Sequence, residues 1–259
     1  MRIVTLMENS ALPGLAAEHG LSLYIEFGQT RILFDAGQSG AFAHNARALG
    51  VDLGQVDFAV LSHGHYDHGG GLTRFLELNG HAPIYVNQYA FGEHYNALDK
   101  YIGLAPELKE SGRLIFVKED FSPVPGVTLT DCAGLPPSEP VEPFGLQMAR
   151  LGRKIPEDFR HEQYMILEEG TRRVVLSGCS HRGVVNIARW LRPDILVGGF
   201  HLMKLDPGSP RLEAAARSLL AGDTVYYTGH CTGEAQYREL KTIMGERLHP
   251  MPAGTVMEL

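Results

Sequence analysis

The segment Ser62-His63-Gly64-His65-Tyr66-Asp67-His68-Gly69-Gly70-Gly71 follows the apolar run Phe58-Ala59-Val60-Leu61. The apolar run predicts a buried strand, and the segment after it predicts a turn at the end of that strand. Four potential metal ligands, His63, His65, Asp67 and His68, occur within six residues. Imidazole and carboxylate groups suit zinc, iron and manganese, so one segment could serve two adjacent ions. The alternative is a solvated histidine-rich turn that caps the next helix.

Three further histidines each follow an apolar run in the last third of the chain. His181 follows residues 174–180, His201 follows residues 195–200, and His230 follows residues 225–229. If these strands end at one edge, their histidines converge there. We therefore predict His181 and His230 as metal ligands, with His201 and Cys179 as additional candidates. Each histidine could instead be buried and held by ordinary hydrogen bonds.

The composition is that of a globular protein that acts on small molecules. Of its 259 residues, 44% are hydrophobic and 20% are charged, and the formal net charge is −7. This balance lacks the basic excess that nucleic-acid binding requires, so a small-molecule partner is expected, with the oligomeric state open. The three cysteines do not form a disulfide framework pattern, and no stretch resembles a membrane span. Residues 1–8 show no signal-peptide pattern, so a cytoplasmic location is expected.

Short strands alternate with helices along most of the chain. Strands are predicted at residues 3–7, 21–27, 31–34, 58–62, 84–86, 114–117, 164–168, 173–177, 195–197 and 225–228. Helices are predicted at residues 41–49, 72–78, 184–191, 210–220 and 233–244. Residues 87–112 predict a helical lid or an ordinary packed helix pair, and residues 134–156 predict an irregular loop. The order indicates one α/β domain, residues 1–259, in which two sheets carry helices on their outer faces.

The segment His63-Gly64-His65-Tyr66-Asp67-His68 resembles the His-x-His-x-Asp-His motif of the metallo-β-lactamase superfamily, and the resemblance extends over most of the chain. It implies a four-layer αβ/βα sandwich of two mixed sheets with the metal site at one edge. It also implies two divalent metal ions, either zinc or, as alternatives, iron or manganese. His63 and His65 would bind the first ion, and Asp67 and His68 the second. Asp35, after an early strand, would hold a ligand histidine in its orientation.

The chain departs from that superfamily pattern at two places. Gly178-Cys179 stands where a Gly-Asp pair would place a carboxylate between the two ions, and the usual separate histidine before that strand has no clear counterpart. Cys179 would then be a thiolate ligand, or a small buried residue beside a one-ion site. His181 or His161 could replace the absent histidine, and Glu162 is an alternative polar site residue.

A narrower resemblance rests on Glu18-His19-Gly20, on Ser177-Gly178-Cys179-Ser180-His181 and on Gly229-His230-Cys231-Thr232-Gly233. These segments look like the branch often labelled dihydropterin-(ribofuranosyl)aminobenzene-phosphate synthase. The resemblance places Glu18 and His19 at the rim of the metal cleft, whereas the residues alone also fit a surface turn before a strand.

Together these features predict a metal-dependent hydrolase or phosphotransfer-like enzyme for a small anionic substrate, a pterin-like compound being one candidate. A metal-bound hydroxide, or a metal ion acting as Lewis acid, would supply the chemistry. Asp67 would orient the nucleophile, and His181, if it is not a ligand, would donate to the developing anion. In a synthase-like variant the ions would bind a leaving diphosphate while an aromatic amine attacks. The alternative is a non-catalytic metal-bearing binding or regulatory protein with an incomplete second site.

Overall fold

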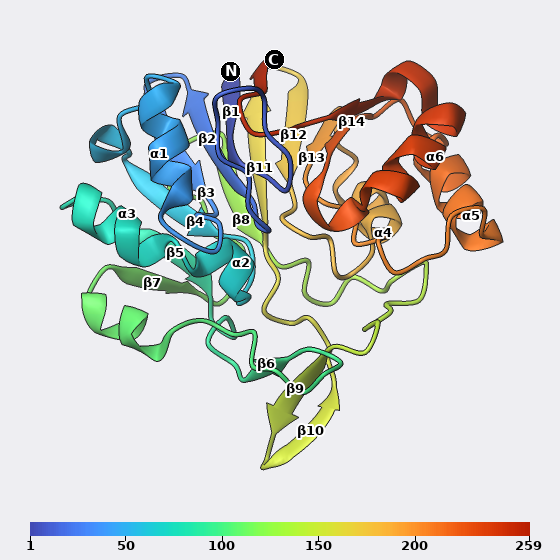
Figure 1. Ribbon diagram of the computed structural model, residues 1–259, viewed down its shortest axis with the longest axis horizontal. Helices are drawn as coiled ribbons and strands as arrows, with labels where there is room; N and C mark the ends of the chain where they lie inside the picture. The colour runs from blue at the N-terminus through green and yellow to red at the C-terminus, as the bar shows by residue number, and fades with distance from the viewer.

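The computed structural model describes residues 1–259, and its first sheet contains most of the strands of the N-terminal half. The strand order is β16-β1-β2-β3-β4-β5-β7. These strands are β1 (Arg2–Met7), β2 (Ser22–Phe27), β3 (Thr30–Phe34), β4 (Phe58–Leu61), β5 (Ile84–Asn87), β7 (Leu114–Val117) and β16 (Val256–Glu258). β1 to β3 pair antiparallel, and β3, β4, β5 and β7 pair parallel. β16 pairs with β1, which places the two chain termini side by side (Figure 1).

The second sheet contains strands of the C-terminal half in the order β15-β14-β13-β12-β11-β8. They are β8 (Val127–Thr130), β11 (Tyr164–Glu169), β12 (Arg172–Leu176), β13 (Ile195–Val197), β14 (Val225–Thr228) and β15 (Leu248–Pro250). β12 to β15 are parallel neighbours. Their carboxyl ends therefore meet at one edge of the sheet, where the loops that carry the predicted histidines begin.

Helices cover the outer face of each sheet, so the molecule has four layers (Figure 1). α1 (Ala41–Ala48) and α3 (Leu72–Leu78) lie against the first sheet, and α4 (Val184–Leu191), α5 (Pro210–Leu219) and α6 (Glu234–Met244) lie against the second. A cluster of 18 buried apolar residues, including Phe34 and Met165, fills the space between the two sheets. This confirms the predicted αβ/βα sandwich. No helix is long and apolar enough to cross a membrane.

Strands β8, β15 and β16 were not predicted from the sequence, and two segments for which a structure was expected differ from that expectation. Residues 87–112 form neither a helical lid nor a helix pair: they hold the two-residue strand β6 (His94–Tyr95) and a 3-10 helix, Pro106–Ser111. Residues 134–156 are not wholly irregular, because they end in the hairpin β9 (Gln147–Arg150) and β10 (Arg153–Pro156). The two segments join in a third sheet, ordered β10-β9-β6. These short, polar strands carry no apolar alternation from which they could be predicted.

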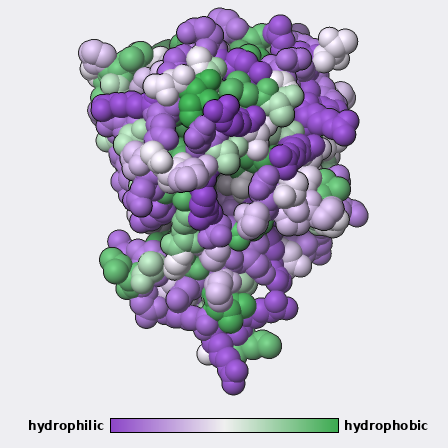
Figure 2. Space-filling view, turned by 90° about the vertical axis from the view of Figure 1, so that its right-hand side faces the viewer, coloured by the Kyte–Doolittle hydropathy of each residue, from purple (hydrophilic) through white to green (hydrophobic).

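The third sheet extends away from the sandwich at the lower end of the molecule (Figure 1). Figure 2, which faces the side of α5 and α6, shows a mostly hydrophilic surface that narrows towards this extension. Leu151, at the turn between β9 and β10, is 97% exposed. The extension therefore adds little to the apolar core, but β6 brings His94 to the edge where the strands of the sandwich end.

Candidate metal centre

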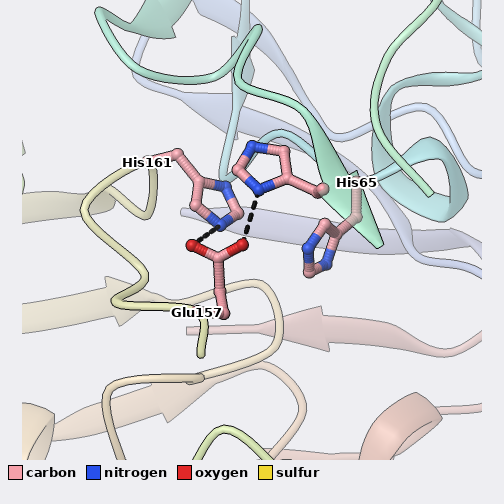
Figure 3. A group of neighbouring side chains, drawn as sticks. His65, Glu157 and His161 are labelled. Atoms are coloured by element: carbon pink, nitrogen blue, oxygen red, sulfur yellow. Dashed lines mark hydrogen bonds and ion pairs between the residues drawn. The ribbon is translucent and has the colours of Figure 1, made fainter. Parts of the chain in front are cut away.

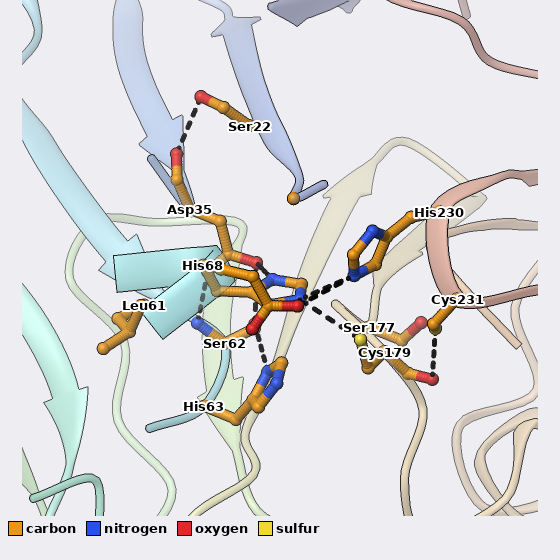
Figure 4. A network of polar contacts seen from close by, with 12 residues as sticks. Ser22, Asp35, Leu61, Ser62, His63, His68, Ser177, Cys179, His230 and Cys231 are labelled. Atoms are coloured by element: carbon orange, nitrogen blue, oxygen red, sulfur yellow. Dashed lines mark hydrogen bonds and ion pairs between the residues drawn. The ribbon is translucent and has the colours of Figure 1, made fainter. Parts of the chain in front are cut away.

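The loops that follow β4, β12, β13 and β14 converge at one edge of the sandwich and bring together most of the predicted ligands. His65 and His161 lie on one side of the cluster, beside Glu157 (Figure 3). His63, His68, Cys179 and His230 lie on the other side (Figure 4). All six of these predicted residues are buried, as is Glu157.

The histidine motif is held tightly against neighbouring backbone. It leaves β4 and enters the single-turn helix α2 (Tyr66–Gly69), which carries Asp67 and His68. A Cβ on Gly64 would lie 1.9 Å from the carbonyl oxygen of Ala90, and a Cβ on Gly71 would lie 2.0 Å from that of Ala36. Only glycine permits such approaches, so these glycines fix the motif in place.

Several site residues have left-handed backbone conformations. Asp35, Ser180, His201 and His230 have φ values of 59°, 57°, 51° and 50°. Non-glycine residues rarely adopt this region, and such conformations collect at functional sites, where the surrounding structure maintains them. In this chain they turn the backbone sharply at the strand ends that lead to the cluster.

His63, His65 and His181 form the first ligand group. Their ring centroids are 4.7 Å (His63 and His65), 4.8 Å (His63 and His181) and 4.9 Å (His65 and His181) apart. The Nε2 atoms of His63 and His181 are 3.3 Å apart. Nitrogens bound at about 2.0–2.1 Å around one tetrahedral ion lie about 3.3 Å apart, with ring centroids about 5 Å apart. The nitrogens of His63 and His181 therefore fit one ion, and the ring of His65 lies at a matching distance from both.

Asp67, His68 and His230 form the second group. Nε2 of His230 lies 3.2 Å from Nε2 of His68 and 3.3 Å from a carboxylate oxygen of Asp67. The same oxygen of Asp67 is 3.9 Å from Nε2 of His68. These separations, too, are close to the edges of a tetrahedral coordination shell.

Cys179 lies between the two groups. Its Sγ is 3.1 Å from Nε2 of His68, and it is within 4.8 Å of ligand atoms of both His63 with His181 and His68 with His230. The thiol is thus close to both pairs of histidines. Burial raises the pKa of the Cys179 thiol well above its usual value, so a nearby cation would be needed to hold it as a thiolate.

The histidines of the first group are neutral, as metal binding requires, whereas His68 holds a proton that an ion would have to displace. Burial lowers the pKa of His63, His65 and His181 well below the usual value, which leaves neutral rings. Burial opposes ionisation of Asp67, but His68, His19 and His230 outweigh it and hold the pKa of Asp67 well below its usual range. Burial acts to lower the pKa of His68, whereas the carboxylates of Asp35 and Asp67 raise it to about 9.

Asp35 orients two of the histidines. Its carboxylate accepts hydrogen bonds from the backbone N–H of Ser62, from Ser62 Oγ and from His68 Nδ1, each at 2.7 Å. Because Ser62 Oγ donates to Asp35, it accepts from Nδ1 of His63, 2.9 Å away. Both His63 and His68 therefore present Nε2 to the centre, the arrangement usual for ligand histidines.

Two residues that hold His230 in place, Glu8 and Asn9, were not predicted from the sequence. Nδ1 of His230 donates to Oδ1 of Asn9 at 2.8 Å, and Glu8 accepts from the backbone N–H of His230. Glu8 and Asn9 follow the apolar strand β1, so the strand-end rule that revealed His181 and His230 could also have revealed them. His94 and Glu157 lie in segments with no such signal.

The sequence profile of the metallo-beta-lactamase superfamily matches residues 16–147. The chain belongs to this superfamily. An uncharacterized protein of Methanocaldococcus jannaschii is 28% identical over 242 residues, which is 89% of this chain and 90% of that protein. A second protein of that organism, named 7,8-dihydropterin-6-methyl-4-(beta-D-ribofuranosyl)-aminobenzene-5'-phosphate synthase, is 28% identical over 270 aligned positions, covering 93% of this chain and 90% of that protein.

A solved structure described as a metal-dependent hydrolase of the beta-lactamase superfamily is 28% identical. It aligns with a TM-score of 0.83 over 100% of this chain and 99% of that one. Superfamily membership, the sandwich fold and the grouped histidine, cysteine and carboxylate side chains together support metal binding and a hydrolase-type function.

The other residues predicted from the sequence lie at different distances from these groups in this superfamily member. His19 contacts Asp67 at 3.3 Å from the half-exposed rim, whereas the carboxylate of Glu18 accepts from Ser39 and does not reach the ligand groups. Glu162 is buried and accepts from the backbone N–H groups of His181 and Arg182 and from the hydroxyl of Tyr164. It therefore holds the His181 loop and has no free oxygen for a substrate.

His161 and His201 lie beside the two groups, and the ligand atom of His201 is within 4.8 Å of those of Cys179 and Cys231, so His201 stays a candidate ligand. Nδ1 of His161 accepts from the backbone N–H of Gly64 at 2.8 Å. His201 packs 4.2 Å from His181, centroid to centroid, and neither of its ring nitrogens has a hydrogen-bond partner. His201 also lines two cavities, one of about 170 Å³ at the centre and an adjacent one of about 310 Å³.

Proposed function

We propose that this chain is a hydrolase with a dinuclear metal centre. The observation that carries the proposal is the position of Cys179 Sγ between two pairs of histidines, His63 with His181 on one side and His68 with His230 on the other. The ring of His65 packs against the first pair, and the carboxylate of Asp67 lies beside the second. The first group supplies three neutral nitrogens, and the second supplies a carboxylate and two nitrogens. This donor set suits zinc, with iron or manganese as alternatives.

Divalent ions held in this way polarise a substrate oxygen and lower the pKa of water towards about 7. The residues of the chain supply the rest. Asp67, ionised and fixed by His19 and His230, can orient a nucleophilic water by accepting its hydrogen bond. His181 faces His63 and is assigned to the first ion, so His201 is the better-placed donor to a developing negative charge.

The substrate class follows from the two connected cavities. His181 and His201 line both, so a molecule in the cavity of about 310 Å³ borders directly on the centre. That cavity also contains Phe144, Phe200 and Arg211, while its two glutamates are paired with Arg189 and Arg211. A small molecule with a flat ring, such as a phosphoester of a pterin-like compound, matches Phe144 and Phe200, and its anionic group would face the proposed ions beside His181 and His201.

The experiment that tests the proposal combines metal analysis with activity. Protein purified without added metal is analysed for zinc, iron and manganese, and is then assayed on phosphomonoesters, phosphodiesters, lactones and pterin-like phosphates before and after chelation. We expect about two ions per chain and turnover that disappears on chelation and returns with metal. Two ions without turnover on any of these compounds, or at most one ion after reconstitution, would instead support a non-catalytic metal-binding protein.

The synthase named among the relatives defines the second reaction to assay. In that reaction class the same centre would bind a leaving diphosphate while an aromatic amine attacks. Incubation with an aminobenzene compound and a dihydropterin diphosphate distinguishes the two, since a synthase would release diphosphate only when both are present, whereas a hydrolase would act on a single ester.

A further inference from the structure

A cavity of about 460 Å³ lies between β7, the edge strand of the first sheet, and the third sheet (Figure 1). Its lining combines residues of the segment 88–94, the 3-10 helix, β7, β9 and the loop after β10. It shares no lining residue with the cavities of about 170 and 310 Å³ at the candidate metal centre. Its volume is in the range of cavities that bind small molecules. Segments distant in the sequence thus form a separate cavity to which the proposed function assigns no role.

This cavity is lined by Lys109, Arg150 and Arg160 and by no aspartate or glutamate, although the chain as a whole has a net charge of −7. Arg160 forms an ion pair with Asp158, and its Nε donates to that carboxylate at 2.8 Å. Lys109 and Arg150 have no such carboxylate partner. In the cavity of about 310 Å³, by contrast, both glutamates are paired with arginines. Two unpaired cations in one cavity favour a ligand with two negative charges.

Three aromatic rings, those of Tyr89, Phe91 and Phe116, line the same cavity. Tyr89 is 42% exposed and Phe116 is 41% exposed, and large side chains exposed together often mark a binding surface. Nζ of Lys109 lies 5.0 Å from the centroid of Phe91, and the guanidinium carbon of Arg160 lies 5.2 Å from that of Tyr89. The rings and the cations are therefore interleaved, so that a ligand ring and a ligand anion could be bound side by side.

His94 separates this cavity from the candidate metal centre. It is 2% exposed and lines the cavity, and its ring centroid lies 5.4 Å from that of His65, which lines the central cavity. A Cβ on Gly92, another lining residue, would lie 3.0 Å from Nε2 of His94, so a larger residue there would press on the ring. Because His94 and His65 stand between this cavity and the proposed ions, a ligand bound here would not meet a metal-bound nucleophile.

We propose that this cavity binds a small aromatic phosphate monoester, of the aryl or nucleoside monophosphate class, which is not converted there. A phosphate monoester carries about −1.5 to −2 charges at neutral pH, which matches the two unpaired cations. Arg150 can donate two parallel N–H groups to the phosphate oxygens, and the ammonium group of Lys109 can neutralise the remaining charge. Tyr89 and Phe116 would contact the ring. The inference does not depend on the proposed metal centre.

Other ligand classes fit this lining less well. An aromatic carboxylate carries a single charge and would leave one of the two cations unpaired. An uncharged aromatic compound would use the rings alone. A nucleic acid would need a basic surface that follows several phosphates, whereas this chain has a net charge of −7. The proposal therefore requires that both the ring and the phosphate contribute to affinity, and each contribution can be measured.

The test is titration calorimetry with benzylphosphonate, an analogue of a phosphate monoester that has no ester bond to hydrolyse. We expect the protein as purified to bind it with a Kd below about 1 mM. Methylphosphonate, which lacks the ring, and benzyl alcohol, which lacks the charge, should each bind about 10-fold more weakly or worse. The titration is repeated after chelation of bound metal. The affinity for benzylphosphonate should not change, because the cavity is separate from the centre.

Two variants and an NMR measurement locate the binding. Arg150→Gln removes an exposed cation and should weaken benzylphosphonate binding about 10-fold, and Phe116→Ala should weaken it several-fold. Arg172→Gln, at an exposed arginine outside the cavity, is the matched control and should bind as wild type does. In NMR spectra of the wild type, benzylphosphonate should shift the backbone amide signal of Gly92 and leave that of Gly183, in the cavity of about 310 Å³, unchanged.

Several results would overturn the proposal. Equal binding of methylphosphonate or benzyl alcohol would show that the ring or the charge is not recognised. An unchanged affinity in Arg150→Gln would place the anion elsewhere, and binding that disappears on chelation would place it at the metal centre. Absence of binding at millimolar benzylphosphonate would also contradict the inference. None of these results except the loss on chelation bears on the proposed function, and that loss would support it.

Discussion

The two sheets contribute to the centre in different ways. The first sheet supplies four of the proposed ligands from one segment, residues 63–68, which is held by close glycine contacts and by the carboxylate of Asp35. The second sheet supplies the other proposed ligands, Cys179, His181 and His230, from loops after β12 and β14, with β13 between those strands. The first set depends on local structure, whereas the second depends on strand register and on the packing of the two sheets. Substitutions should therefore affect the two sets differently.

The largest effect is expected from Asp67, the one carboxylate among the proposed ligands. Asp67→Ala should reduce the metal content from about two ions to about one and lower turnover about 10³-fold or more, because a lost ion removes several kcal/mol of stabilisation of the transition state. Metal analysis and steady-state kinetics check this. Asp223→Ala, at an exposed carboxylate, is the control. Full activity in Asp67→Ala would show that the second ion is assigned to the wrong residues.

Cys179 lies between the proposed ligands of the two sheets, and its replacement should weaken the binding of both ions. Removal of a shared ligand in Cys179→Ala should lower both affinities by about 100-fold or more, beyond the effect of losing an orienting group. Cys179→Asp should retain two ions, because a carboxylate can occupy the same shared position. Chelator competition measures both, with the buried Cys132→Ala as control. Unchanged affinities in Cys179→Ala would place the thiol outside the coordination shell.

Replacement of Asp35 tests the proposed ligands of residues 63–68 without changing those from the second sheet. In Asp35→Asn the new amide cannot accept from Ser62 and His68 at every position that the carboxylate serves. Both His63 and His68 lose their fixed orientation, so we expect each ion to bind about 10- to 100-fold more weakly. The measurement is the same chelator competition. Equal affinities in wild type and variant would indicate that packing alone orients these two rings.

The smallest effect on metal binding is expected from the core between the sheets. Met165 is fully buried in the cluster that joins them. Met165→Ala should cost about 2–5 kcal/mol in the free energy of unfolding, because it removes buried contacts and leaves a cavity. Metal affinity should fall only several-fold, because only the proposed ligands from the second sheet would shift. Denaturant unfolding and chelator competition, with the exposed Met203→Ala as control, check both expectations. Complete loss of both ions would show that residues 63–68 also depend on the packing of the two sheets.

Long or strongly apolar elements were predictable from the sequence. β13, β14, α3 and α4 begin and end at the predicted residues, since apolar runs bounded by Gly, Pro and Asp determine them. β6, β9 and β10 were missed because they pair through backbone hydrogen bonds without an apolar pattern. Their positions depend on contacts between distant segments.

The same distinction applies to the site. The motif at residues 63–68 could be found because its ligands are adjacent in sequence, and His181 and His230 because each follows a strand that ends in glycine. His94 and Glu157 could not, since they lie 29 and 92 residues from His65 in the sequence and meet it only after folding. The choice of His181 over His161 also required the structure, because it depends on the hydrogen bond from Gly64 to His161.

The central claim is that two ions are held on either side of Cys179. Anomalous diffraction at the zinc edge, from crystals of zinc-loaded protein, tests it most directly. We predict two peaks about 3.5 to 4 Å apart, one among His63, His65 and His181 and the other among Asp67, His68 and His230, with Cys179 Sγ between them. A single peak, or a peak enclosed by His94, Glu157 and His161, would contradict this account.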